Sequence, residues 1–257
     1  MIAIISDIHA NREALTVVLA EILALNPEKV ICLGDIVGYG AEPAWCIDAI
    51  RSSCEVVICG NHDSALIYGS ENFSDEAAKS VKYHRSILSP APRTEGGNEN
   101  NTERQRWDFL KGLSHRYVEE DNLFVHASPR NPVNEYLRER DCRLQLNTKL
   151  SENFNRIEKV AFVGHTHKAG IINSNFEFIR PDALSLPYWP AEEKKAIINV
   201  GSVGQPRDGD PRACYVTLQA EGIRYHRVEY DVEKASTKIR QNEHLSDHTA
   251  DRLKDGT

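Results

Sequence analysis

An apolar run passes abruptly into a polar cluster in the sequence Val56-Val57-Ile58-Cys59-Gly60-Asn61-His62-Asp63. The β-branched residues of this run favour a buried strand, and the glycine that follows is a residue at which strands commonly end. A strand that ends in an amide, an imidazole and a carboxylate presents polar groups at the edge of a sheet. The fold is therefore expected to be built around strands whose ends carry the chemistry.

Four further apolar runs end in the same way. They are Ile2–Ser6 before Asp7 and His9, Val30–Leu33 before Asp35, Leu123–Val125 before His126, and Val160–Val163 before His165 and His167. The carboxyl ends of strands line the ligand crevice of open α/β sheets. The five polar tips are therefore expected to converge, although they are far apart along the chain.

The tips supply seven nitrogen and oxygen donors to one place. The donors are Asp7, His9, Asp35, Asn61, His126, His165 and His167. A single catalytic ion that keeps an open coordination position cannot use so many, whereas two ions with a bridging carboxylate can. The sequence therefore predicts a site for two metal ions.

These motifs resemble those of the calcineurin-like metallophosphoesterase superfamily, in its small bacterial and archaeal branch. The similar motifs are D-x-H at 7–9, G-D at 34–35, G-N-H-D at 60–63, His126 after a strand, G-H-T-H at 164–167 and N-V-G-S-V-G-Q-P-R at 199–207. The resemblance implies an α/β fold, an α+β sandwich of two stacked mixed β-sheets flanked by helices in four αββα layers. It also implies a phosphomonoesterase or phosphodiesterase, in which a hydroxide bridging two metal ions attacks phosphorus in line.

The resemblance also assigns roles to the donors. It places Asp7, His9 and His167 on the first ion, Asp35 between the ions, and Asn61, His126 and His165 on the second. It further implies that His62 contacts the phosphoryl group and protonates the leaving oxygen. Asp63 is expected to orient the ring of His62.

The chemistry of the donors narrows the choice of metal. Four imidazoles disfavour Mg²⁺ and Ca²⁺, which prefer oxygen, so Mn²⁺ or Fe is expected, with Zn²⁺, Ni²⁺ and Co²⁺ as alternatives. Two divalent ions, two carboxylates and a hydroxide leave a net charge of about +1, which attracts a phosphate dianion. Arg130 and Arg207 follow strand ends in loops and either grip the substrate phosphate or lie on the surface; the two readings have equal weight.

A chain of 257 residues with 40% hydrophobic residues can form one large domain, here expected over 1–257. Strands alternate with helical patterns in the first part of the sequence, and this alternation stops after Asp63. Helical patterns at 74–88 and 103–113 then predict a helical insertion over 64–116 beside the site. Insertions of this kind often determine substrate selectivity.

The net charge of −7 disfavours a nucleic-acid-binding protein, and a nuclease in particular. Six cysteines without a CxxC pair indicate reduced thiols and a cytoplasmic protein, and no apolar run approaches membrane length. A small phosphorylated molecule is the expected substrate. A phosphoprotein phosphatase, a dinucleoside polyphosphate hydrolase and a catalytically silent interaction scaffold remain alternatives, and the sequence does not predict the oligomeric state.

Overall fold

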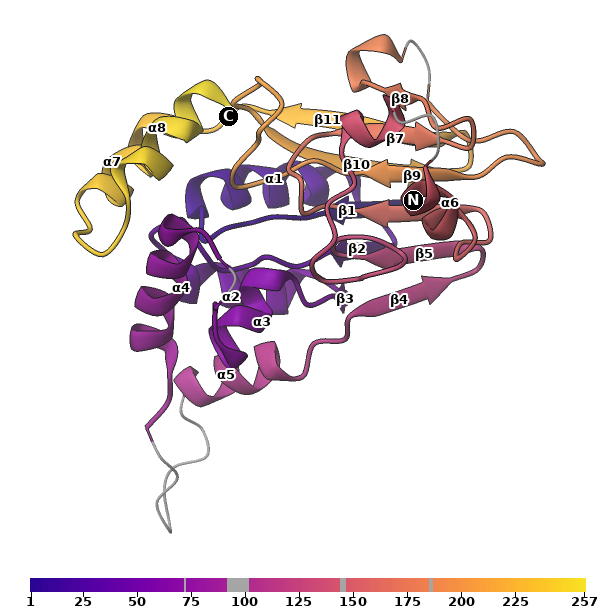
Figure 1. Cartoon of the computed structure of the whole chain (residues 1–257). Coiled ribbons are helices and arrows are strands. Elements are labelled where there is room, and N and C mark those ends of the chain that lie inside the picture. The colour runs from indigo at the N-terminus through magenta and orange to yellow at the C-terminus, as the bar shows by residue number, and fades with distance from the viewer. Residues whose placement is uncertain (72, 92–101, 144–146, 185–186) are drawn as a thin grey trace.

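Two mixed β-sheets pack face to face at the centre of the protein (Figure 1). The computed structural model describes residues 1–71, 73–91, 102–143, 147–184 and 187–257. In order across the first sheet, the strands are β11 (Gly222–Val228), β10 (Ala213–Gln219), β1 (Ile2–Ile5), β2 (Lys29–Cys32) and β3 (Val56–Val57). The second sheet contains β4 (Arg116–Glu119), β5 (Asn122–Val125), β6 (Val160–Val163), β9 (Ala196–Asn199), β7 (Gly170–Asn173) and β8 (Phe178–Ile179).

Residues of alternating orientation on the central strands divide the core into layers. Ile4 and Ile31 contribute to the core between the two sheets, where they pack in one cluster with Phe124 and Phe162. The neighbouring residue Ile5 belongs to a second cluster under helices α1 (Arg12–Leu25) and α2 (Pro43–Ser53). A third cluster joins the second sheet to α6 (Thr148–Phe154). Helices therefore cover the outer faces of both sheets, as the family resemblance implied.

The strands that follow His167 are divided between the two sheets. β10 pairs antiparallel with β1 in the first sheet, and β9 pairs parallel with β6 in the second. The five polar tips therefore come from both sheets: three follow strands of the first sheet and two follow strands of the second. Hydrophobic alternation identifies a strand but not its partner, because pairing depends on packing between distant residues.

A group of helices lies between β3 and β4. It contains α3 (Asn61–Tyr68), α4 (Asp75–Leu88) and α5 (Thr102–Lys111), with α3 in contact with both of the others (Figure 1). The sequence patterns predicted α4 and α5 but missed α3, whose first turn consists of Asn61, His62 and Asp63. The polar motif after β3 is therefore the start of a helix, and its residues project from a rigid element.

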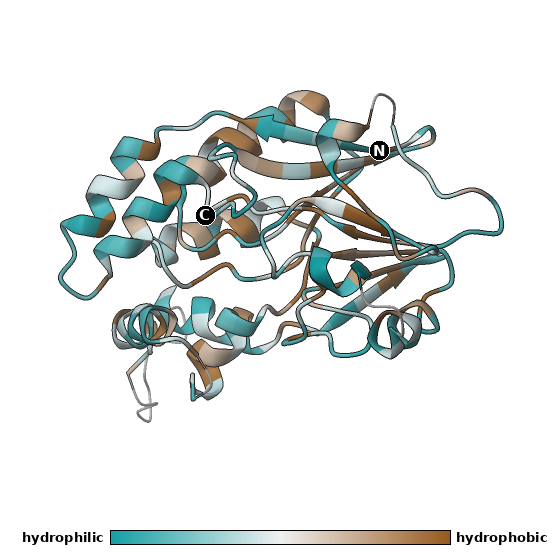
Figure 2. Ribbon diagram, turned by 45° about the horizontal axis from the view of Figure 1, so that its top comes forward, coloured by the Kyte–Doolittle hydropathy of each residue, from teal (hydrophilic) through white to brown (hydrophobic). Residues whose placement is uncertain are grey.

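The last two helices, α7 (Val232–Arg240) and α8 (Asp247–Asp255), pack on each other, and α7 also packs on α1. Their apolar faces form a small cluster of their own, which includes Ile239, Ala250 and Leu253. Figure 2 shows the helices at this end of the protein as mainly hydrophilic with some hydrophobic bands, whereas the central strands are mostly hydrophobic. Packing of α8 against the body fixes the position of the polar side chains that it carries.

Two general features of the chain can be stated for the described residues. All six cysteines are free thiols, in agreement with the expectation of reduced cysteines. Among the helices in these residues, none is both long and apolar enough to cross a membrane.

The stack of Phe124 and Phe162 between the sheets provides a test of this architecture. Their rings lie 5.0 Å apart at 11°, and both residues are fully buried. Phe162→Ala is expected to destabilise the protein by about 3–5 kcal/mol because it leaves a cavity between the sheets. Thermal unfolding should show a fall in Tm on the order of 10 °C. Val118→Ala, at a half-exposed position on β4, is the control, and an equal fall in both variants would contradict this packing.

Candidate metal centre

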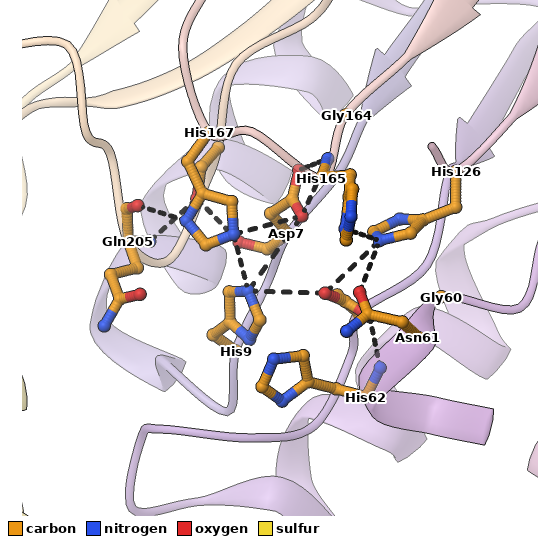
Figure 3. Close-up of polar contacts among 12 residues, drawn as sticks. Asp7, His9, Gly60, Asn61, His62, His126, Gly164, His165, His167 and Gln205 are labelled. Carbon is orange, nitrogen blue, oxygen red and sulfur yellow. Dashed lines mark hydrogen bonds and ion pairs between the residues drawn. The ribbon is translucent and has the colours of Figure 1, made fainter. Parts of the chain in front are cut away.

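The seven predicted donors lie together in a buried site between the ends of the two sheets. Figure 3 labels these donors except Asp35. Asp7 and His9 follow β1, Asp35 follows β2, Asn61 opens α3, His126 follows β5, and His165 and His167 follow β6. Backbone hydrogen bonds tie these loops to one another. Asp7 N donates to Gly34 O at 3.0 Å, and Gly204 N, after β9, donates to Asp7 O at 2.9 Å. The second of these bonds links the two sheets directly at the site.

Each ring of the first histidine pair is fixed by a backbone carbonyl. Nδ1 of His9 lies 3.0 Å from Val37 O, and Nδ1 of His167 lies 2.6 Å from Gln205 O, so in both rings Nδ1 carries the proton and donates. Burial holds both pKa values well below their usual range, so both imidazoles are neutral. Their Nε2 atoms face each other at 3.0 Å without a proton between them. Two opposed lone pairs at this distance are stabilised by a cation.

The second histidine pair has the same design. His126 Nδ1 donates to Leu33 O at 2.9 Å, and His165 Nε2 donates to Asn134 O at 3.3 Å. The remaining ring nitrogens, Nε2 of His126 and Nδ1 of His165, lie 3.1 Å apart. Figure 3 shows the two pairs side by side, with the rings of each pair turned toward one another. All four imidazoles therefore direct a ligand atom into the same space.

The oxygen donors lie beside the two histidine pairs, so that the donors form two groups. Asp35 Oδ2 lies between the pairs, 3.6 Å from His9 Nε2 and 3.3 Å from His126 Nε2. Asp7 Oδ1 lies 3.4 Å from His167 Nε2, and Asn61 Oδ1 lies 3.0 Å from His126 Nε2. The donor atoms of Asp7, His9, Asp35 and His167 lie within 4.8 Å of one another, as do those of Asp35, His126 and His165. The donors present therefore fit two cations that share the carboxylate of Asp35.

The charges of the buried carboxylates also favour cations. Burial raises the pKa of Asp7 to about 7. Burial would also raise the pKa of Asp35, but the neighbouring His126 and His62 hold it well below its usual range. Burial would lower the pKa of His126, yet the carboxylate of Asp35 raises it to about 9. A proton on His126 thus balances the charge of Asp35, and a bound metal ion would take the place of that proton.

The loops hold most of the donors in an unfavourable backbone conformation. Positive φ angles occur at Asp7 (55°), His9 (48°), Asp35 (52°), His165 (63°) and His167 (59°). Non-glycine residues rarely adopt this left-handed region, and each instance costs on the order of 1 kcal/mol or more. Strain concentrated on the donor residues indicates that the surrounding fold is organised to hold their side chains in place.

Two glycines of the sequence motifs make room for the carboxylates. A Cβ atom on Gly60 would lie 2.1 Å from Asp35 Oδ1, and one on Gly164 would lie 2.4 Å from Asp7 Oδ2. Neither distance is tolerated by non-bonded atoms. Each glycine therefore allows the carboxylate from another strand to pack against its own loop.

The role expected for Asp63 is corrected by its contacts. Asp63 Oδ1 accepts hydrogen bonds from Ile36 N and Val37 N at 2.9 and 3.3 Å, and Oδ2 accepts one from Gly60 N at 3.0 Å. Both carboxylate oxygens are thus engaged by the backbone, and neither contacts the ring of His62. Asp63 instead fastens the loop after Asp35 to the start of α3, as an acidic residue in the first helical turn can do.

His62 lies beside the donors with its ring free. In the described residues neither ring nitrogen has a hydrogen-bond partner, and Nδ1 is buried. Burial lowers the pKa of His62 to about 4, so the imidazole is neutral at pH 7. The ring packs against those of His9 and Tyr39, with centroids 4.8 and 4.7 Å apart, and the residue lines a cavity. His62 is therefore available to a molecule in that cavity.

The two arginines named from the sequence lie in different surroundings. The Arg130 guanidinium binds Glu135 and Glu152, so the structure favours the surface role over substrate binding for this residue. Arg207 lines the same cavity as His62, and its Nη2 donates to Gln205 Oε1 at 2.6 Å.

Two further residues at the site had no signal in the sequence. His84 of α4 accepts a hydrogen bond from Gly38 N at 3.0 Å and donates to Gly40 O at 2.9 Å, so it holds the loop that packs against His62. Arg252 of α8 lines the cavity together with Arg207. Each occupies an ordinary position in a helical pattern, and only the packing of that helix brings it to the site.

The protein is similar to several known proteins over its whole length. An uncharacterised protein of Methanocaldococcus jannaschii is 34% identical over 254 residues, which cover 94% of this chain and 93% of that protein. A metallophosphoesterase of Sphaerobacter thermophilus with a crystal structure is 32% identical, with a TM-score of 0.79 and coverage of 100% of this chain and 98% of that one. A hypothetical protein of Pyrococcus horikoshii shares the fold at 18% identity, with a TM-score of 0.69 and coverage of 100% and 99%.

The family model for the calcineurin-like phosphoesterase superfamily domain matches residues 1–222. That range contains all seven donors and His62, and it leaves most of β11 and both C-terminal helices outside. The matched range and the relatives agree with the geometry of the buried site. The chain belongs to the calcineurin-like phosphoesterase superfamily and is a metal-dependent phosphoesterase.

Proposed function

We propose that this protein is a dinuclear-metal-dependent phosphohydrolase that acts on small phosphorylated molecules. The observation that carries the proposal is the pairing of four imidazoles, each fixed by a backbone carbonyl, around a shared carboxylate. Asp7, His9 and His167 would hold one ion, and Asn61, His126 and His165 would hold the other. Asp35 would contribute its carboxylate to both.

The ions would supply the chemistry that the side chains lack. When bound, two divalent ions lower the pKa of a water molecule to produce a nucleophile near neutral pH, and they stabilise charge on the phosphoryl oxygens during in-line displacement. Four imidazole ligands support Mn²⁺ or Fe as the native metal, with Zn²⁺, Ni²⁺ and Co²⁺ as further possibilities.

The chain itself binds and orients the substrate. The neutral ring of His62 carries one N–H group that can donate to a phosphoryl or leaving-group oxygen, and no protein acceptor in the described residues competes for it. The positive charge of Arg207 attracts the phosphate from the side of the cavity. Since loops and helices α3, α4 and α8 bound the cavity, it suits a small molecule better than an extended polymer, in agreement with the net charge of −7.

Metal content tests the dinuclear assignment. Protein prepared with Mn²⁺ is expected to hold about two ions per chain by mass spectrometry of the metals, and Asp35→Asn should lose at least one, because both groups of ligands share that carboxylate. Asp48→Asn removes the same charge from a surface ion pair with Arg106 and is the matched control. Full metal content in Asp35→Asn would contradict a bridging role.

His62 is tested by turnover at constant metal content. His62→Ala is expected to keep its metal ions and to lose about 10² or more in kcat, because the residue contacts the phosphoryl group without being a ligand. Steady-state hydrolysis of model monoesters, diesters and nucleotides provides the measurement, with His115→Ala, an exposed histidine, as the control. Unchanged turnover in His62→Ala would remove it from the mechanism, and hydrolysis of no phosphoester by the native protein would favour an interaction scaffold.

A further inference from the structure

The cavity beside the candidate metal centre is larger than one phosphate needs. Its volume is about 840 Å³. The lining includes the candidate ligands Asn61 and His165 together with His62, and it also includes Arg207 and Arg252. Cavities that take small organic ligands measure about 300–1,000 Å³. Space therefore remains for an organic body and for a further polar group beyond the phosphoryl group at the metal ions.

Arg207 borders the donors on one side of this cavity. Its backbone N donates to His167 O at 3.1 Å, which ties it to a candidate ligand, and its guanidinium lies over the ring of Tyr39 at 5.5 Å. The Nε atom is buried and has no hydrogen-bond partner in the described residues.

Arg252 reaches the same cavity from helix α8. Its Nε donates to Thr257 O at 2.6 Å, and its helix neighbours Ala250 and Leu253 are buried in the C-terminal cluster. These contacts position the guanidinium and leave its Nη groups without a protein partner in the described part of the chain. The pKa of Arg252 is lowered first by burial and then by the charge of Arg207, so two like charges act on each other here.

In the described residues, neither the Arg207 nor the Arg252 guanidinium has an Asp or Glu side-chain carboxylate within ion-pair distance. The acceptor of Arg252 Nε is the main-chain oxygen of Thr257, and that of Arg207 Nη2 is the amide oxygen of Gln205. Arg106, Arg130 and Arg227, in contrast, each pair with a carboxylate. The acidic residue that acts on Arg252, Glu76, lines the cavity without pairing with it. Two guanidinium groups that line one cavity and keep N–H groups without a protein acceptor in the described residues can bind an anion.

Aromatic side chains form another part of the lining. Tyr136 and Tyr68 line the cavity, with 37% and 71% of their surfaces exposed. The ring of Tyr136 is held against His165, with centroids 4.0 Å apart. The Arg138 guanidinium also lies over the Tyr136 ring, 4.4 Å from its centroid. The more exposed ring of Tyr68 is therefore the one that can stack on a flat aromatic group of a ligand.

We propose that Arg207 and Arg252 form a second anion subsite, which binds an outer phosphoryl group of the substrate while another phosphoryl group occupies the metal centre. The preferred substrates then carry two phosphoryl groups on an organic body with a flat face, as a nucleoside diphosphate does. This inference rests on the proposed function, since it assumes that phosphate binds at the metal ions. It assigns substrate selectivity to α8, which lies outside the residues matched by the family model.

The test compares ADP with AMP as probes that differ by one phosphoryl group. Isothermal titration calorimetry of the full chain, with Mn²⁺ in excess over nucleotide, is expected to show ADP binding about tenfold or more tightly than AMP. Arg252→Gln should remove most of this preference by weakening ADP binding selectively. Lys254→Gln removes the same charge from the same helix, where it pairs with Glu233, and should keep the preference.

The proposed subsite would be refuted if the native protein bound ADP and AMP with equal affinity. It would also be refuted if Arg252→Gln weakened the binding of ADP and of AMP by the same factor. Thermal unfolding of both variants shows whether α8 remains packed. Arg252→Lys keeps the positive charge but lacks the planar guanidinium, so it should retain part of the preference for ADP if α8 is intact. Hydrolysis of p-nitrophenyl phosphate by the same preparation tests the proposed function separately. Hydrolysis without an ADP preference refutes only the subsite, and an Arg252-dependent preference without hydrolysis of any phosphoester refutes only the proposed function.

Discussion

The site depends on hydrogen bonds between imidazoles and backbone carbonyl oxygens. Each of the four histidines donates one ring proton to a carbonyl, and this bond determines which nitrogen remains free for a metal ion. Three of these carbonyls belong to loops that follow strands of the sheets, at Leu33, Val37 and Gln205. The same loops that carry or flank the donors therefore also set their protonation and orientation. A change in loop geometry would alter both at once.

Maintaining these loops requires the rest of the fold. Five of the donors have left-handed backbone angles, which isolated loops of non-glycine residues would avoid. Hydrogen bonds between loops of different strands, and the close approach of Gly60 to Asp35 and of Gly164 to Asp7, hold them in place. The core between the two sheets keeps the strand ends at a constant separation. The strain is thus offset by packing over a much larger volume than the site itself.

Elements beyond the central sheets shape the space in front of the metal centre. Helix α3 presents His62 from its first turn, and Asp63 of the same turn anchors the neighbouring loop. His84 of α4 holds the loop at Gly38 and Gly40, and α8 contributes Arg252. Six of the seven donors follow strand ends, whereas Asn61 and much of the cavity wall belong to helices. Changes in the wall could therefore alter selectivity without disturbing most of the donors.

The sequence by itself determined the fold class and the set of residues that the structure brings together, because strands, glycines and donors follow one another at short range. A donor directly after a β-branched run must lie at a strand end, whatever the partner strand is. Only the tertiary structure decided which sheet each strand joins, that Asp63 binds backbone amides and not His62, and that Arg130 is neutralised by Glu135. Only the packing of α4 and α8 brought His84 and Arg252 to the site. These outcomes depend on contacts between residues far apart in the chain, and local patterns of hydrophobicity and spacing contain no information about such contacts.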